Sequence, residues 1–161
     1  MAKEKFPVTA AVRVLRQHSV RYGEHLYEYE ERGGTRKSSE ALGVPEHSVI
    51  KTLVMQDDAG QPLVVLMHGD REVSTQSLAR QLGRRSIVPC RPEIATKHTG
   101  YLVGGTSPFG LRSPLPIYVE ESVLQLPLVY INGGKRGFLV SLTPAELLRV
   151  LSPTSVQVAT G

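Results

Sequence analysis

Two glycine pairs constrain the possible folds of this chain more than any other feature. Gly104-Gly105 lies in the segment GYLVGGTSPFG (Gly100–Gly110), and Gly133-Gly134 lies in INGGKRG (Ile131–Gly137). Each pair follows a short apolar run, where glycines mark positions of positive φ or of close backbone approach. Such turns either connect strands in a β-rich domain or hold a polar ligand with backbone N–H groups. Both interpretations are open at this point.

Neither glycine segment has the pattern of a nucleotide-binding loop. A Walker A loop has a lysine and then a serine or threonine directly after its second glycine. Gly105 and Gly110 have the required spacing, but Leu111 occupies the lysine position. No GxGxxG segment opens a predicted helix. The sequence therefore argues against a P-loop NTPase or a dinucleotide enzyme, and we expect no cofactor.

Length and apolar content predict one domain that spans residues 1–161. The chain has 161 residues and 40% hydrophobic content, which is enough for one sizeable core. Its longest apolar run, Leu63–Met67, is far shorter than the roughly 20 residues that a membrane span needs, and Met1–Ala10 has no leader pattern. We therefore expect a cytoplasmic protein without a membrane partner. The one cysteine, Cys90, excludes an internal disulfide, and a buried or half-buried thiol is favoured over a catalytic one.

Basic residues are concentrated in two parts of the chain. The formal net charge is +4, from 19 basic and 15 acidic residues. Between positions 80 and 98 the only acidic residue is Glu93, and the basic residues there are Arg80, Arg84, Arg85, Arg91 and Lys97. A second group, Arg112, Lys135 and Arg136, lies beside the glycine pairs. Either group suits a polyanion such as a nucleic acid, or forms an ordinary solvated face.

Short apolar segments alternate with turn signals along the chain. Helices are predicted at Val8–His18, Ser38–Leu42, Thr75–Leu82, Pro92–His98 and Ala145–Leu151. Strands are predicted at Leu26–Glu30, Val49–Gln56, Pro62–Met67, Ser86–Val88, Pro116–Val119, Leu128–Ile131 and Phe138–Leu142. Glu31–Lys37 is expected to be a surface loop, and GGKRG a hairpin turn. This order indicates an α/β (α+β) fold with a curved mixed β-sheet or partly closed barrel surrounded by short helices.

Lys51 is unusual because it lies within the apolar strand VIKTLVMQ (Val49–Gln56). Successive side chains point to opposite faces of a strand, and both faces of this one are mostly apolar. Lys51 therefore either guards a sheet edge or lines a pocket where its charge meets an anion or a carbonyl group. The residues alone do not decide between these two roles.

The common catalytic patterns are absent from the sequence. The five histidines, at 18, 25, 47, 68 and 98, show no HxH or HExxH spacing, and no GxSxG segment occurs. The carboxylate pairs Asp57-Asp58 and Glu120-Glu121 fall in predicted turns or at strand ends, where solvated charge is expected. We therefore expect no metal site. If the chain is an enzyme, its chemistry rests on Lys51, turn amides, ordered water or the substrate itself.

Three segments in one order, VIKTLV (Val49–Val54), GYLVGGTSPFG and INGGKRG, resemble the YbaK family of aminoacyl-tRNA deacylases. The resemblance covers nearly the whole chain. Members of this family are similar to the editing domain inserted in bacterial prolyl-tRNA synthetases, and the YbaK branch removes cysteine mistakenly attached to the proline tRNA. The resemblance therefore implies a compact α/β fold with a curved mixed sheet around a small pocket.

The resemblance also implies roles for particular residues. The residues expected to act in catalysis are Lys51, Gly104 and Gly105. Those expected to bind the substrate are Tyr27, Thr52, Thr106, Ser107, Gly133 and Gly134. Those expected to bind tRNA are Arg112, Lys135 and Arg136. The sequence departs from the family pattern at Leu139, where an aspartate is frequent, and near Gly34, where an aromatic residue is expected.

The function implied by the resemblance is removal of cysteine from tRNA(Pro), with the substrate thiol attacking its own ester. Because Leu139 departs from the pattern, a deacylase that uses water to release alanine or serine stays an alternative. A catalytically silent module that binds tRNA or a synthetase is another. The partners expected are the acceptor end of an aminoacylated tRNA and a complex with prolyl-tRNA synthetase.

Overall fold

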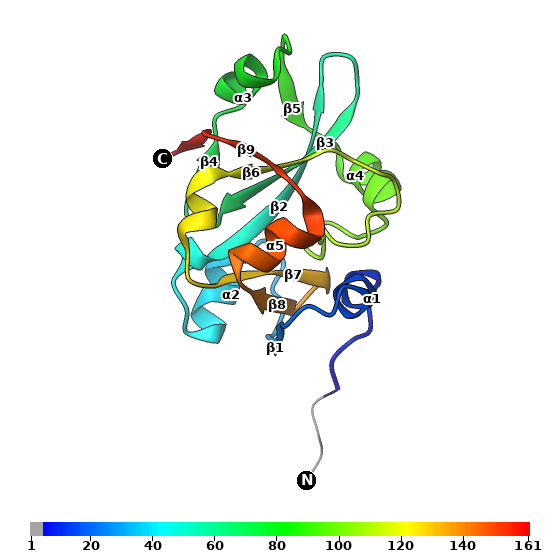
Figure 1. Cartoon of the computed structure of the whole chain (residues 1–161), viewed down its shortest axis with the longest axis vertical. Coiled ribbons are helices and arrows are strands. Elements are labelled where there is room, and N and C mark those ends of the chain that lie inside the picture. Colours follow the sequence, from blue (N-terminus) through cyan, green and yellow to red (C-terminus); the bar gives the residue numbers. More distant parts are fainter. Residues whose placement is uncertain (1–4) are drawn as a thin grey trace.

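The computed structural model describes residues 5–161 (Figure 1). The helices are α1 (Ala10–Gln17), α2 (Gly34–Leu42), α3 (Thr75–Leu82), α4 (Pro92–Thr99) and α5 (Pro144–Leu151), with 3₁₀ turns at Glu46–Ser48 and Glu121–Gln125. None of the helices in this range is long and apolar enough to cross a membrane. The prediction that Met1–Ala10 has no leader pattern concerns residues 1–4 in part, and these lie outside the described residues.

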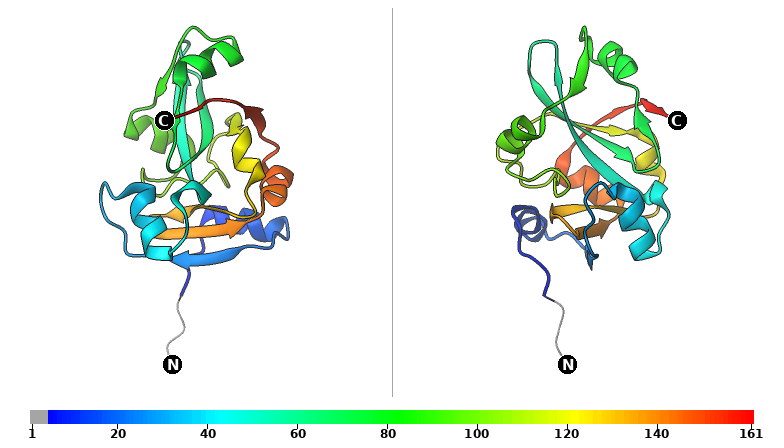
Figure 2. Two further views of the ribbon diagram at one scale, coloured as in Figure 1. Left: turned by 90° about the vertical axis from the view of Figure 1, so that its left-hand side faces the viewer. Right: turned by 180° about the vertical axis from the view of Figure 1, so that it is seen from behind.

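The strands form one large mixed sheet and a small two-stranded one. The strands are β1 (Gly23–Leu26), β2 (Val49–Asp57), β3 (Pro62–His68), β4 (Glu72–Val73), β5 (Ile87–Pro89), β6 (Ile117–Glu120), β7 (Val129–Lys135), β8 (Phe138–Leu142), β9 (Thr154–Val156) and β10 (Ala159–Thr160). In the described residues the large sheet has eight strands in the order β1-β8-β7-β2-β3-β6-β9, with β5 paired to β2. The β2–β7, β3–β6 and β6–β9 pairs are parallel and the others antiparallel, which confirms the predicted mixed sheet (Figure 2).

Strand β2 lies at the centre of this arrangement. It pairs with β3 along most of its length, with β7 at Val49 and Ile50, and with β5 at Met55–Asp57. Lys51 pairs with Met67 on β3, and it lies between the part of β2 that pairs with β7 and the part that pairs with β5. Its position in the lining of the cavity described below favours the pocket interpretation over the edge-guard one.

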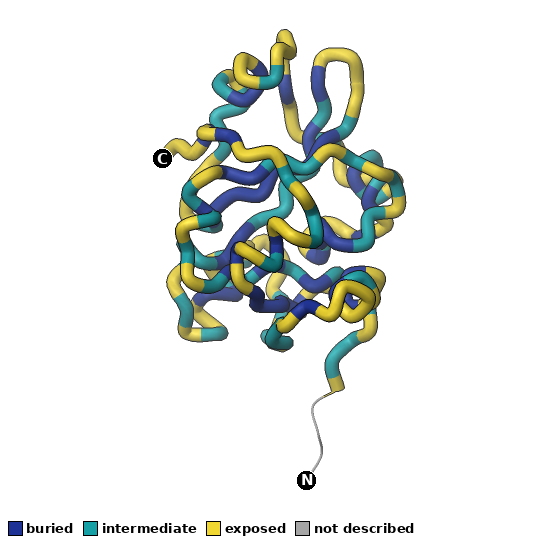
Figure 3. Tube along the Cα trace, in the orientation of Figure 1, coloured by how far each residue is buried: buried dark blue, intermediate teal, exposed yellow. Residues whose placement is uncertain are grey.

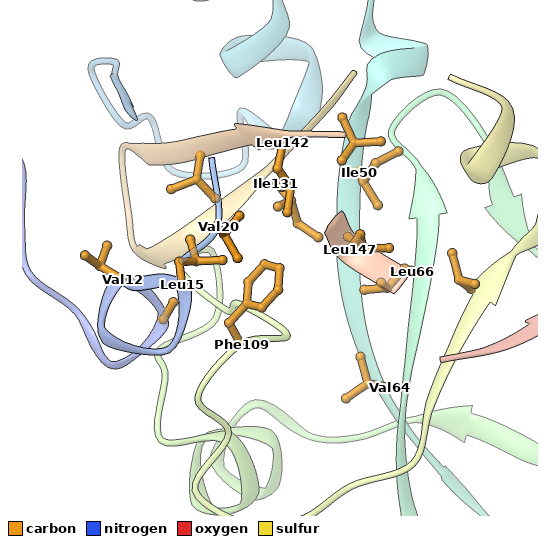
Figure 4. Packing of buried hydrophobic residues seen from close by; sticks show 14 of the residues in the cluster. Val12, Leu15, Val20, Ile50, Val64, Leu66, Phe109, Ile131, Leu142 and Leu147 are labelled. Carbon is orange, nitrogen blue, oxygen red and sulfur yellow. The ribbon is translucent and has the colours of Figure 1, made fainter. Parts of the chain in front are cut away.

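Two hydrophobic clusters hold the layers together. The larger one joins α1, α5 and the sheet, and includes Leu15, Leu66, Phe109, Ile131 and Leu147, each completely buried (Figure 4). The smaller one lies under α3 and includes Met55, Val65, Met67, Leu78 and Val158. Many buried residues lie on the central strands, and many exposed residues lie in the connecting segments (Figure 3). Both clusters combine apolar residues of the strands with apolar residues of helices and connecting segments.

The chain between β1 and α2 differs from the prediction. The strand expected at Leu26–Glu30 lies earlier, at Gly23–Leu26, because its partner β8 begins at Phe138, opposite Leu26. Tyr27 continues past the sheet, and its backbone N–H donates to the Gly137 carbonyl at 2.9 Å. Helix α2 begins at Gly34 rather than Ser38, so the expected loop Glu31–Lys37 is partly helical.

The hairpin predicted around GGKRG is present between β7 and β8, but Gly133 and Gly134 do not form its turn. They lie inside β7, where the pairing with β8 shifts between Asn132 and Lys135, and the reversal occurs at Arg136-Gly137. A β-carbon on Gly133 would lie 2.4 Å from a ring carbon of Phe138. The glycine pair is therefore a bulge that lets β7 pass over the Phe138 ring.

Several helix ends follow the sequence signals closely. Thr143 caps α5 through its hydroxyl, which accepts the Glu146 N–H, and Pro144 occupies the first turn of the helix predicted at Ala145–Leu151. Ser74 caps α3 in the same way, and Gly83 ends it with φ of 67°. Val8 was predicted as the first residue of a helix, but it precedes α1 and is 51% exposed.

Two carboxylates expected to be solvated are buried instead. Asp57 accepts hydrogen bonds from the backbone of Ala59 and Gln61 and pairs with Arg84 at 2.9 Å, so it closes the β2–β3 turn. Glu120 accepts hydrogen bonds from the backbone of Ser122, Val158 and Ala159. A carboxylate next to a turn signal is expected from the sequence to be solvated. Here the free backbone N–H groups of the turn or of the chain end stabilise each buried carboxylate instead.

Candidate functional site

A cavity with a volume of about 760 Å³ lies beside the central strand β2. It lies between β2, the segment before and within α2, the start of α4 and the two glycine segments. These elements face the viewer in the right-hand view of Figure 2, whereas α5 lies on the opposite side of the sheet. The residues predicted from the sequence that line this cavity are Tyr27, Lys51, Thr52, Gly104, Thr106 and Arg136.

Lys51 reaches the cavity from the central strand β2. Its side chain is only 19% exposed, and its Nζ lies 3.2 Å from Oε1 of Glu72. Glu72 lies on β4 and is 77% exposed, so the partner of the half-buried ammonium faces solvent. An ammonium in this position can stabilise negative charge that develops on a bound ligand.

Thr52 contributes an unusual polar atom beside Lys51. Its Oγ1 is buried and has no hydrogen-bond partner within residues 5–161. Such groups are rare in folded proteins because desolvation without a partner costs about 1–3 kcal/mol. A polar atom of a ligand in the cavity could supply the missing partner, so this hydroxyl is suited to recognition.

The two glycine segments contact each other at the mouth of the cavity. Asn132 Nδ2 donates to the Gly104 carbonyl at 3.1 Å, and Arg136 Nε donates to the Val103 carbonyl at 2.9 Å. A β-carbon on Gly105 would lie 2.8 Å from the Arg136 backbone nitrogen. These contacts fix the position of the first segment relative to the second.

Some of the glycine amides that the sequence suggested as ligand donors are already used by the fold. The Gly105 N–H donates to the Leu102 carbonyl at 2.8 Å, and the Gly134 N–H donates to Asn132 Oδ1 at 2.7 Å. Within residues 5–161, no hydrogen bond from the backbone N–H of Gly104 or Thr106 is found. Those two amides therefore can serve as donors to a ligand in the cavity.

Comparison with known proteins identifies the family. A family model described as "Aminoacyl-tRNA editing domain" matches residues 31–150 of this chain. The chain belongs to this family. The match includes Lys51 and both glycine segments, so the resemblance predicted from the sequence is confirmed.

Two relatives and one solved structure show how far the similarity of this editing domain extends. It is 30% identical over 99% of both chains to "Putative Cys-tRNA(Pro)/Cys-tRNA(Cys) deacylase EbsC" of Enterococcus faecalis. It is 34% identical over 71% of its length to a proline–tRNA ligase of Moorella thermoacetica, of which the match covers 19%. A structure described as "a putative trans-editing enzyme for prolyl tRNA synthetase" has a TM-score of 0.82 and 25% identity, over 97% of this chain and 100% of that one.

Tyr29 is a cavity residue of the editing domain that the sequence analysis missed. The Arg136 guanidinium lies over its ring at 5.2 Å from the centroid, and a β-carbon on Gly104 would lie 2.7 Å from its hydroxyl oxygen. Tyr27 lines the same wall, and burial raises the pKa of its hydroxyl. The alternation in YEYE (Tyr27–Glu30), which places both tyrosines on one side of an extended segment, is the signal that could have found Tyr29.

Several predicted site residues do not line the cavity. Ser107 is completely buried, and its Oγ accepts the Phe109 N–H at 3.1 Å, so it shapes the first glycine segment. The others outside the cavity lining are Gly105, Arg112, Gly133, Gly134 and Lys135. Arg112 and Lys135 are exposed, whereas the glycines allow close packing behind the cavity.

Cys90 and Leu139 add two less polar groups to the cavity wall. Cys90 is half-buried, as expected, and burial raises the pKa of its thiol, which disfavours the nucleophilic thiolate. Leu139 is 4% exposed, so the wall of the editing domain is apolar at the position where the family frequently has an aspartate.

His47, His68 and Asp70 come together although the sequence spacing gave no sign of a metal site. The two imidazole rings stack with centroids 3.7 Å apart and planes inclined by 7°. A metal ion binds a histidine lone pair in the ring plane, and nearly parallel planes offer no common point. Both ring nitrogens of His68 also lie 2.7 and 2.8 Å from the His47 carbonyl oxygen and Ser122 Oγ. The cluster is therefore suited to packing rather than to metal binding.

Proposed function

We propose that this editing domain is a freestanding deacylase that removes mischarged cysteine from tRNA(Pro). The observation that carries the proposal is Lys51, a half-buried cation in the wall of the 760 Å³ cavity, next to a Thr52 hydroxyl that has no hydrogen-bond partner within residues 5–161. The name of the Enterococcus faecalis relative, which matches over 99% of both chains, supports the same substrate class. The whole chain, 1–161, acts as one editing domain in the cytoplasm.

The chemistry needs no nucleophile from the protein. In cysteinyl-tRNA the substrate sulfur bonds to its own carbonyl carbon, and the bond from that carbon to the ribose oxygen breaks. The ribose oxygen gains the proton that the thiol loses, so the products are free tRNA and a cyclic thioester. Lys51 and the amides of Gly104 and Thr106 stabilise the negative charge on the carbonyl oxygen, an effect worth about 10² to 10³ in rate for one donor.

Leu139 bears on which amino acid is accepted. Its buried apolar side chain disfavours a serine hydroxyl, which would lose hydrogen bonds to water against this wall. The same wall accepts cysteine and alanine, which keeps hydrolysis of alanyl-tRNA by a bound water as a second candidate function. Pocket size distinguishes such side chains by only about 10- to 200-fold, whereas the self-cleaving route requires a thiol.

The tRNA is held mainly at its acceptor end. Arg112, Lys135 and Arg136 are exposed and supply phosphate contacts that depend on salt rather than on base sequence. A complex with prolyl-tRNA synthetase would provide the tRNA identity that such contacts lack.

The test is release of labelled amino acid from cysteinyl-tRNA(Pro) and alanyl-tRNA(Pro) by wild type, Lys51→Ala and the control Lys97→Ala. Lys97 is an exposed lysine on α4 that does not line the cavity. We expect rapid cysteine release, slow alanine release, and at least a tenfold loss in Lys51→Ala alone. Faster release of alanine supports the second candidate. If tRNA binds but neither ester is cleaved, the chain is a binding module instead.

A further inference from the structure

The Lys51–Glu72 pair places opposite charges side by side in the wall of the cavity. The two side-chain atoms lie 3.2 Å apart, and both residues line the cavity. The Lys51 side chain is 19% exposed and the Glu72 side chain 77%, so the negative member is closer to solvent. A ligand that carries adjacent negative and positive groups would match this arrangement.

An aminoacyl ester is such a ligand. Its carbonyl oxygen carries partial negative charge, which increases as the ester is attacked, and its α-ammonium is positive. With ordinary bond lengths the α-nitrogen and the carbonyl oxygen are about 3 Å apart, close to the spacing of the two protein charges. When the carbonyl oxygen lies at Lys51, the α-ammonium can therefore lie at Glu72.

We propose that Glu72 binds the α-ammonium group of the amino acid attached to the tRNA. This inference rests on the proposed function for its substrate class. Glu72 thereby selects an aminoacyl ester over an ester without an amine, and orients the carbonyl toward Lys51. The contact is a charge-assisted hydrogen bond, which is stronger than one between neutral groups.

Other carboxylates of the cavity are less suited to this role. Glu46 Oε2 accepts the Thr35 hydroxyl at 2.7 Å, and Glu30 pairs with Lys37 at 3.4 Å. Both of these partners belong to α2, whereas Lys51 lies on β2. Glu72 is the carboxylate that contacts Lys51 directly.

The backbone at Glu72 is held while its side chain can move. Strand β4 pairs with the last strand β10, with Glu72 opposite Thr160. The exposed carboxylate can leave Lys51 and turn toward a ligand without loss of buried contacts. Glu72→Gln is therefore expected to fold normally.

The experiment measures binding of two uncleavable probes by calorimetry. One is 3′-amino-3′-deoxyadenosine acylated with alanine through an amide, and the other has lactic acid in place of alanine. The two differ only by the replacement of the ammonium with an uncharged hydroxyl. We expect wild type to bind the alanyl probe about 10- to 100-fold more tightly than the lactyl probe. Glu72→Gln should reduce this preference to less than about threefold and leave lactyl binding unchanged.

Glu31→Gln is the matched control, because Glu31 is an exposed carboxylate that lines the same cavity. This variant should keep the wild-type preference for the alanyl probe. The inference is overturned if Glu72→Gln keeps the preference, if it weakens both probes equally, or if wild type has no preference or binds neither probe.

Release of cysteine from cysteinyl-tRNA(Pro), measured on the same proteins, separates this inference from the proposed function. A wild type that releases no amino acid but prefers the alanyl probe, with the preference lost in Glu72→Gln, supports the role of Glu72 and contradicts the deacylase. A wild type that releases cysteine, with the alanyl preference intact in Glu72→Gln, supports the deacylase and contradicts the role of Glu72.

Discussion

Gly105 and Arg136 are in close backbone contact, although they lie 31 positions apart in the sequence. A β-carbon on Gly105 would lie 2.8 Å from the Arg136 nitrogen and 3.0 Å from the Lys135 carbonyl carbon. The atoms it would meet are backbone, which cannot rotate away as a flexible side chain can. This contact requires a glycine and holds the mouth of the cavity in one shape.

Gly105→Ala should therefore destabilise the protein and lower its activity. We expect a loss of about 2–3 kcal/mol in the free energy of unfolding, because overpacking against backbone cannot relax easily. Gly60→Ala is the control: its φ is 77° and no atom of residues 5–161 lies within 4 Å of the added carbon, so only backbone strain of about 1 kcal/mol is expected. Urea unfolding and cysteine release check both variants. Equal losses of stability in the two, with activity intact, would contradict the packing argument.

Thr52→Val should separate stability from function. Since the buried Thr52 hydroxyl has no partner among the described residues, its replacement by a methyl group should leave the free energy of unfolding unchanged or raise it by up to about 1 kcal/mol. Activity should fall about tenfold if the hydroxyl binds the substrate. Thermal unfolding and kcat/KM for cysteinyl-tRNA(Pro) give the two readouts.

Thr99→Val is the matched control for Thr52→Val. Thr99 is 1% exposed, but its hydroxyl donates to the Ala95 carbonyl at 2.8 Å and accepts the Tyr101 N–H at 3.1 Å. This variant should lose about 1–3 kcal/mol because the Tyr101 N–H is left without its acceptor. If Thr52→Val loses as much, the Thr52 hydroxyl has a structural partner in solution.

Lys135→Gln should weaken tRNA binding in a salt-dependent way. If its ammonium contacts one phosphate, the slope of log K against log salt should become less negative by roughly one. Arg149→Gln removes one charge on α5, on the other side of the sheet, and should leave the slope unchanged. Filter binding from 50 to 300 mM salt, about the range over which phosphate contacts weaken strongly, measures both slopes. Equal slopes for wild type and Lys135→Gln would remove Lys135 from the tRNA surface.

Glu120 should make the stability of the protein depend on acid pH. Burial alone would raise the pKa of this carboxyl, but hydrogen bonds from Ser122, Val158 and Ala159 outweigh burial and hold the pKa below the ordinary value of a glutamate. The carboxylate therefore stabilises the fold above the unfolded-state pKa, and this contribution is lost as pH falls through the lower folded-state pKa. The affected range begins near pH 4.5 and extends downward.

Glu120→Gln should lower the free energy of unfolding at pH 7 by about 1–3 kcal/mol and flatten its decline in that acid range. Glu28→Gln, at an exposed position, should keep the wild-type profile. Urea unfolding at successive pH values measures all three proteins. A wild-type decline that persists unchanged in Glu120→Gln would assign the acid sensitivity to another carboxylate.

Local signals in the sequence predicted the helices and most strands well. The caps Ser74 and Thr143 and the stop at Gly83 act through neighbouring backbone, so their effect is contained within a few residues. The start of α2 was missed because a glycine in a polar segment indicates a loop in the sequence. In the structure Gly34 has a φ of 58° and is the first residue of the helix. The bulge at Gly133-Gly134 was read as a turn because both features favour glycine pairs.

The cavity was less predictable because its residues meet through long-range pairing. Lys51 was recognisable as a charge in an apolar strand, but its partner Glu72 depends on where β4 lies beside β10. Tyr29 reaches the cavity only because the chain leaves the sheet after Leu26, where β8 begins. A single sequence contains no local signal for either relationship.

The order of strands has a consequence for how the protein is made. Strand β1 pairs with β8, so Gly23 can pair only after Ser141 has been synthesised. Likewise, Val49 can pair with Tyr130 only after β7 has been synthesised. During synthesis the cavity cannot close around Lys51 until β7 and β8 have left the ribosome. Contacts of such high sequence separation slow folding and leave apolar strands exposed in the meantime. A nascent chain that stops before β7 would thus carry the key lysine but no working pocket, and would be a target for chaperones rather than an editor of tRNA.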